Sequence, residues 1–173
     1  LGTATADSSG NFSITPTSNL ADNNYSLTVT AVDTAGNTST ESSALLVTID
    51  TINPSTPLIV SSPLTNDSTP TIIGTGEPNS KVTLFIDSSV LGTATADSNG
   101  NFSITPTSNL ADNNYSLTVT AVDAAGNTST TSSPISLTVD TVSLTPSALA
   151  TAPLTNNPTP AITGTAEAGS TVT

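Results

Sequence analysis

Short runs in which apolar and polar residues alternate cover most of the chain, and Pro, Gly, Asn and Asp separate them. In the clearest run every second residue is apolar: Tyr115, Leu117, Val119 and Ala121. A period of two is the signature of a half-buried strand, and no stretch shows the helical period. The pattern therefore predicts an all-β protein in which each strand has one face packed on the core and one face exposed to solvent.

Seven such runs follow one another between residues 51 and 140, at a spacing of about ten residues, without cysteine pairs. This predicts a two-sheet sandwich of immunoglobulin-like type with antiparallel strands. Tyr115, five residues after Leu110, fits a tyrosine corner, and we expect Asp112 to orient it. The inward positions expected in the other runs are Leu58, Val60, Ile72, Val82, Leu84, Ile86, Phe102, Ile104, Ile135, Leu137 and Val139.

The chain repeats itself at an offset of 90 residues. Residues 1–50 match residues 91–140 at 42 of 50 positions, and residues 51–83 match residues 141–173 at 14 of 33. A unit of this length can hold a small core of its own. We expect the C-terminal part of a first repeat in residues 1–50, a complete repeat in residues 51–140 and the N-terminal part of a third in residues 141–173, all within a longer parent protein.

Composition excludes several classes of function. The net charge is −12, with thirteen carboxylates against one base, Lys81, so nucleic acid and anionic membrane are poor partners. The absence of His and Cys leaves no nucleophile and base pair, and we expect no enzyme. No apolar run approaches a membrane span. Abundant Ser, Thr and Asn in near-identical tandem copies is typical of secreted or cell-surface bacterial proteins.

Four strings carry a resemblance to a known family: "TPTIIGTGEP", "LGTATADSNGN", "YSLTVTAVDAAGN" and "VDT". The sequence resembles the bacterial Ig-like domains that repeat many times in giant secreted adhesins, and the resemblance covers the whole chain. It implies an extracellular stalk that holds a terminal binding domain away from the cell. It also implies calcium at the junctions between domains, which related repeats bind.

The strand order predicts where the acidic loops lie. If the strands alternate in direction, three loops of the complete repeat leave the sandwich at the end where its first strand begins, close to the end of the preceding repeat. We expect the junction to bring together Asp50, Glu77 and Asp123, with Asp97 and Asn127 as further donors. At the next junction the corresponding acids are Asp140 and Glu167.

Such a cluster favours a cation, because three carboxylates repel one another unless a positive charge lies among them. Calcium takes about six to eight oxygen ligands and suits carboxylates and carbonyls, and the resemblance implies calcium in particular. Each loop taken alone also fits an ordinary turn, since Asp and Asn beside Gly are common turn residues.

The expected function is an extender of a bacterial surface adhesin, stiffened by calcium between neighbouring repeats of the chain. Two alternatives stay open. One is a module that itself binds carbohydrate or a host protein, which would need an exposed aromatic or apolar patch. The other is a filament or matrix fibre in which the C-terminal residues of one chain complete the N-terminal residues of the next by strand addition.

Overall fold

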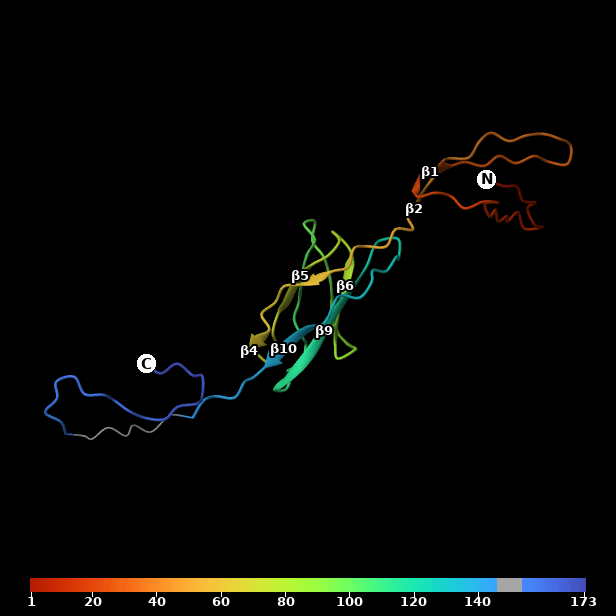
Figure 1. Ribbon diagram of the computed structural model, residues 1–173. Coiled ribbons are helices and arrows are strands. Elements are labelled where there is room, and N and C mark those ends of the chain that lie inside the picture. The colour runs from red at the N-terminus through yellow and green to blue at the C-terminus, as the bar shows by residue number, and fades with distance from the viewer. Residues whose placement is uncertain (146–153) are drawn as a thin grey trace.

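The computed structural model describes residues 1–145 and 154–173, and every regular element in them is a strand (Figure 1). Residues 51–140 form a two-layer sandwich, as the sequence predicts. One layer has the strand order β4 (Leu64–Thr65), β10 (Ile135–Val139), β9 (Asn113–Val122), β6 (Lys81–Ile86) and β7 (Ser89–Thr95). The other has the order β3 (Leu58–Ile59), β5 (Ile72–Thr75) and β8 (Asn101–Ile104).

Neighbouring strands of the sandwich pair antiparallel, except that β4 runs parallel to β10. The first strand predicted from the sequence is therefore two short strands, β3 and β4, in different sheets. Residues 51–140 contain eight strands instead of the seven expected. The immunoglobulin-like fold class is confirmed.

The core lies between the two sheets and consists of the inward side chains of alternating strands. Its buried apolar residues are Ile59, Ile72, Val82, Leu84, Ala96, Phe102, Ile104, Leu117, Val119, Ala121, Leu137 and Val139. The alternation predicts most of this set, although Ile86, Tyr115 and Ile135 are only partly buried and Ala96 was not predicted. It fails at the start of the repeat. Ile59 is buried, whereas Leu58 and Val60 are about half exposed. The prediction fails here because β3 has two residues before the chain passes to the other sheet, which is too few for alternation to show which side chains point inward.

The tyrosine corner is present. The Tyr115 hydroxyl donates a hydrogen bond of 2.9 Å to the carbonyl of Ala111, and Tyr25 makes the same bond to Ala21. Asp112 does not orient the tyrosine. Its Oδ1 instead accepts hydrogen bonds from the backbone N–H and the hydroxyl of Thr141, just beyond the last strand.

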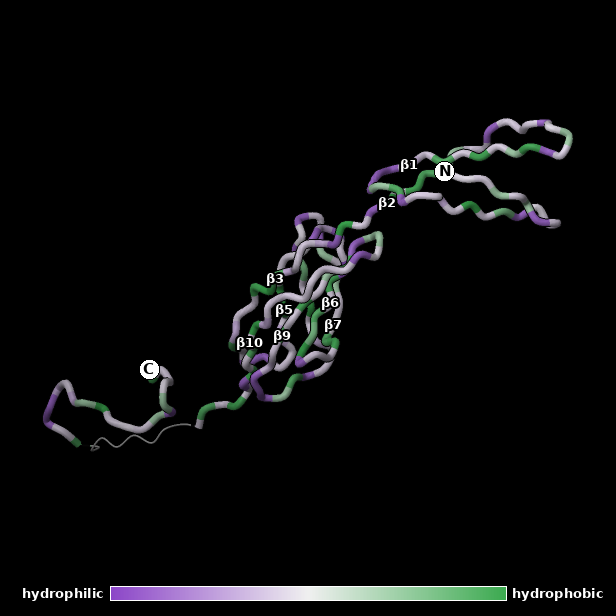
Figure 2. The backbone as a smooth tube through the Cα atoms, turned by 45° about the vertical axis from the view of Figure 1, so that its right-hand side comes forward, coloured by the Kyte–Doolittle hydropathy of each residue, from purple (hydrophilic) through white to green (hydrophobic). Residues whose placement is uncertain are grey.

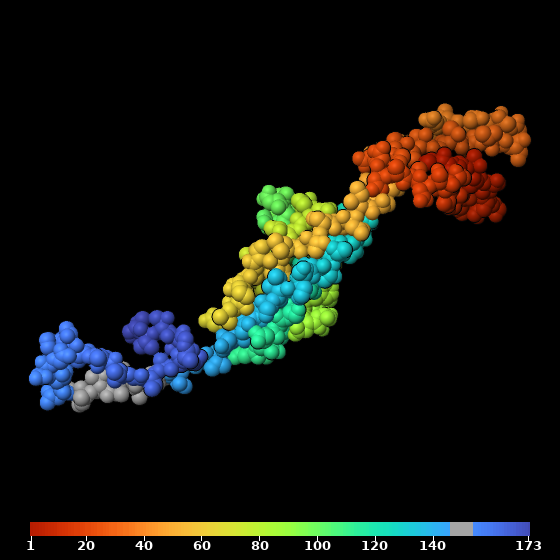
Figure 3. All heavy atoms as spheres, viewed as in Figure 1, coloured from red at the N-terminus to blue at the C-terminus, as the bar shows by residue number. Residues whose placement is uncertain are grey.

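The flanking copies leave apolar side chains exposed that the complete repeat buries. Phe12 is 55% exposed and its counterpart Phe102 4%; Ile162 is 62% exposed and its counterpart Ile72 1%. Residues 1–50 contain one strand pair, β1 (Asn23–Leu27) with β2 (Leu45–Ile49). Figures 2 and 3 show the two flanking segments at opposite ends of the sandwich. The sandwich therefore has an entry end, reached from β2, and an exit end, left from β10.

Candidate functional site

The loop Asp123–Asn127 at the entry end is closed by its own side chains. Asp123 Oδ1 accepts the backbone N–H groups of residues 125, 126 and 127 at 2.8–2.9 Å. Its Oδ2 accepts the amide of Asn127 at 2.9 Å. Gly126 has φ 97°, a conformation that favours glycine. Asp123, Gly126 and Asn127 thus each have a structural role in the turn.

Three other loops share the pattern Asp-x-x-Gly-Asn and the same closure. They begin at Asp7, Asp33 and Asp97, and in each the aspartate accepts the amide of the asparagine four residues later. Hydrogen bonds from Asn127, from its side chain first and then its backbone, hold the pKa of Asp123 below its usual value, and those from Asn101 do the same for the pKa of Asp97. The motif is therefore a self-contained turn that keeps its carboxylate ionised.

The loops meet at the entry end, as the strand order predicts. A backbone hydrogen bond of 2.8 Å from Gly76 to Gly100 joins the loop after β5 to the loop after β7. The loop after β9 reaches the preceding repeat, because the Asn127 amide donates to the carbonyl of Asp50 at 3.0 Å. The hydroxyls of Thr56 and Thr130 are also hydrogen-bonded.

The acidic side chains do not form one cluster. Within residues 1–145 and 154–173, no group of three or more Asp, Glu, His or Cys side chains is placed to hold a metal ion. The donor set as it stands therefore does not fit a calcium cage, and Asp123 already accepts four hydrogen bonds. Calcium binding itself stays a prediction.

The remaining predicted ligands lie in local turns. The carbonyl of Glu77 accepts the Ser80 hydroxyl at 2.7 Å, and the carbonyl of Glu167 accepts the Ser170 hydroxyl at 2.8 Å. Asp140 accepts the N–H of Val142 at 3.1 Å, beyond the exit end. These contacts account for the turns and leave the ligand roles of the three acids as predictions.

Sequence reasoning missed the residues that fix the exit from each repeat. Asp22 Oδ1 accepts the N–H and the hydroxyl of Thr51 at 3.1 and 2.9 Å, and Asp112 and Thr141 repeat this arrangement. The signal was available, because both the aspartate and the threonine recur at the offset of 90 residues. What the sequence does not show is that residues 29 apart meet.

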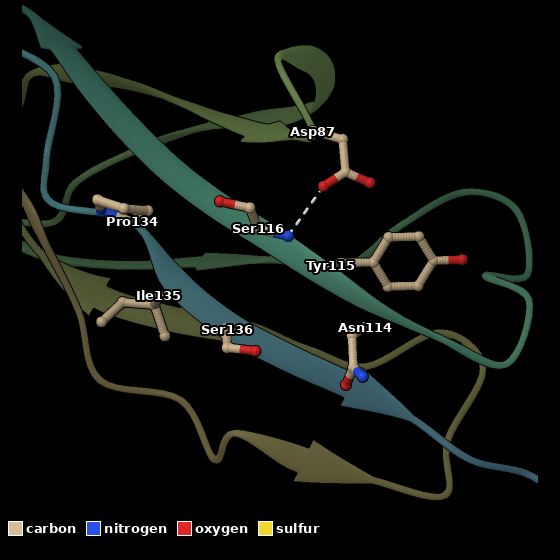
Figure 4. A pocket seen from close by; sticks show the side chains of 7 residues that line it. All are labelled: Asp87, Asn114, Tyr115, Ser116, Pro134, Ile135 and Ser136. Carbon is tan, nitrogen blue, oxygen red and sulfur yellow. Dashed lines mark hydrogen bonds between the residues drawn. The ribbon is translucent and has the colours of Figure 1, made fainter.

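A shallow groove of about 410 Å³ lies towards the exit end (Figure 4). Its lining residues are Asp87, Asn114, Tyr115, Ser116, Pro134, Ile135 and Ser136. Asp87 Oδ1 accepts the N–H of Ser116 at 2.9 Å, and the Tyr115 hydroxyl is bonded to Ala111. With these groups engaged in the fold and one aromatic ring in the wall, the groove gives binding of a carbohydrate no specific support.

The fold and its end-to-end joints define an immunoglobulin-like repeat module. A family model for the bacterial Ig-like domain matches residues 1–51 and 60–141, and the chain belongs to that family. Domains of this family are typically non-catalytic and commonly extracellular. No helix in the described residues could cross a membrane.

Comparison with solved structures finds a similar chain in the fibronectin(III)-like modules of CbhA from Clostridium thermocellum. The two share 19% sequence identity with a TM-score of 0.46, and the match covers 69% of this chain and 64% of that one. A search of curated proteins finds no match.

Proposed function

We propose that this chain is part of the extracellular stalk of a bacterial surface adhesin, in which each Ig-like repeat is a spacer that carries a distal binding domain away from the cell. The observation that carries the proposal is the joint at the entry end, where Asn127 of one repeat bonds to the last residue of the preceding one, Asp50. A spacer needs repeats that connect end to end.

The distribution of charge supports the same function. None of the thirteen carboxylates lies in a strand. The acidic residues therefore occupy the loops, and Lys81 is the one charged residue in the described strands. Thr, Ser and Asn predominate on the outward positions of β9 and β10, whereas Leu58 and Ile73 are about half exposed on the other sheet. The face formed by β9 and β10 is therefore well hydrated and offers no large apolar patch to a partner.

The location can be tested with antibodies raised against residues 51–140. We expect them to label intact cells that make the protein, with a cytoplasmic protein as the unlabelled control. Labelling that appears only after the cells are permeabilised would contradict an extracellular stalk.

Calcium at the joint is a separate prediction from the sequence, and the spacer role does not depend on it. With a dissociation constant of roughly 0.1 to 1 mM, a few mM calcium would stabilise the folded protein by about 1 to 2 kcal/mol for each site. We expect a higher melting temperature with calcium than with chelator, and Asp50→Ala together with Glu77→Ala should remove the difference. Equal melting temperatures in the two conditions would end the calcium prediction and leave the spacer role intact.

Assembly between chains stays a prediction. The exposed Phe12 and Ile162, whose counterparts are buried in the complete repeat, show that both flanking segments have apolar surface to cover. Neighbouring repeats of a longer chain or segments of another chain would both cover it, and the stalk proposal rests on neither choice.

A further inference from the structure

The amide of Asn127 is a donor shared between two repeats. One of its hydrogens goes to Asp123 Oδ2 within the loop, at 2.9 Å, and the other goes to the carbonyl of Asp50, at 3.0 Å. Both donors of the side chain are thereby used. The residue closes its own turn and fastens the preceding repeat with the same group.

The chain contains matched loops that lack this second bond. Asn37 occupies the corresponding place in the first repeat, and its amide bonds to Asp33. Asn101 closes the loop after β7, and its amide bonds to both carboxylate oxygens of Asp97. Turn closure alone therefore does not explain the contact with Asp50.

The linker residue after Asp50 is in turn hydrogen-bonded to the preceding repeat. Thr51 donates its N–H and its hydroxyl to Asp22 of the preceding repeat, and Ile52 donates its N–H to Asp50 Oδ1 at 3.0 Å. Two consecutive residues are thus fixed, one by the following sandwich and one by the preceding segment. That arrangement leaves little freedom between the two bodies.

Two prolines continue the restraint into the sandwich. Pro54 and Pro57 are both buried, and each restricts φ at its own position and the conformation of the residue before it. Between them and β3 the linker has no flexible Gly-rich stretch. The linker 50–57 is therefore anchored at several points, through the hydrogen bonds of Asp50 and Thr51 and the buried rings of Pro54 and Pro57.

We propose that the loop Asp123–Asn127 is a docking surface for the linker that leaves the preceding repeat, and that Asn127 closes this joint without a bound cation. The partner that fits is the carbonyl of an Asp-Thr pair at the end of a last strand. A neutral amide on a neutral carbonyl depends neither on calcium nor strongly on ionic strength. The inference rests on the proposed function in one respect: a closed joint is what gives a spacer its reach.

Backbone ¹⁵N relaxation of the full chain tests this joint. In chelator, we expect order parameters for Thr51 and Ile52 near the value of about 0.85 that rigid backbone shows, and below about 0.6 in Asn127→Ala. Asn37→Ala is the matched control, because it removes the same kind of turn bond without touching the joint, and it should leave both linker amides ordered. Unchanged amide shifts in β5 and β9 would show that each variant keeps the sandwich.

Two outcomes would overturn the proposal. One is an ordered linker in Asn127→Ala, which would mean that Asn127 closes nothing. The other is a wild-type linker that is mobile in chelator and becomes ordered with calcium, which would make the cation the closing element. Neither outcome affects antibody labelling of intact cells, so the joint and the stalk can fail separately.

Discussion

Gly74→Ala should strongly destabilise the complete repeat. A Cβ at this position would lie 2.1 Å from the carbonyl oxygen of Leu58 and 2.4 Å from the ring of Phe102. A backbone carbonyl and a ring that is itself buried cannot both move away without opening the contact between β3, β5 and β8. Overpacking costs roughly 1 to 3 kcal/mol and occasionally more, and contacts this short with backbone and a buried ring place Gly74→Ala at about 3 kcal/mol.

For a repeat of this size, we expect Gly74→Ala to lower the melting temperature by roughly 12 to 24 °C, since each kcal/mol shifts it by about 4 to 8 °C. Thermal unfolding followed by circular dichroism measures it. Gly76→Ala is the matched control, because its Cβ would meet Pro57 at 3.5 Å and Val82 at 3.6 Å, which are ordinary contacts. In the third repeat, Ala166 corresponds to Gly76 and Gly164 corresponds to Gly74.

Gly76→Ala should therefore leave the melting temperature within a few degrees of the wild type. If both variants melted alike, or if Gly74→Ala melted like the wild type, the close packing of Leu58 and Phe102 around Gly74 would be wrong.

Alternation along the chain was enough to predict the sandwich and most of its core. It worked for β9, whose ten residues repeat the period several times. It failed at Leu58 and Val60, because β3 has two residues and the chain changes sheet directly after it. The need for glycine at position 74 was also invisible in the sequence, since it arises from Phe102 on a neighbouring strand.

The candidate site was predictable in its place and less so in its chemistry. The strand order correctly brought the loop after β9 to the end of the preceding repeat. The sequence did not show that the carboxylates stay apart, each in its own turn. Asp97 and Asp123 accept hydrogen bonds from their own loops. The residue that makes the contact with Asp50 is an amide, Asn127, 77 positions away in the chain, and no local pattern distinguishes it from Asn37.

The second prediction with a large expected effect concerns how the length of the stalk grows with the number of repeats. Insertion of one, two and three further copies of residues 51–140 after Asp140 gives a series in which every added joint has the sequence of the present one from Thr51 onward. The longest strand of the repeat, β9, has ten residues, so each copy should add roughly 30 to 40 Å at about 3.3 Å per residue. With closed joints the increments stay equal, whereas flexible joints make the dimension grow as the square root of the number of repeats.

The same series with Asn127→Ala in every copy provides the comparison, and we expect its increments to shrink as copies are added. Small-angle X-ray scattering of the wild-type series is the most direct test of the spacer account. Equal increments in the maximum dimension from one inserted copy to three are the expected result. Increments that diminish along the wild-type series would show freely jointed repeats and would contradict the account.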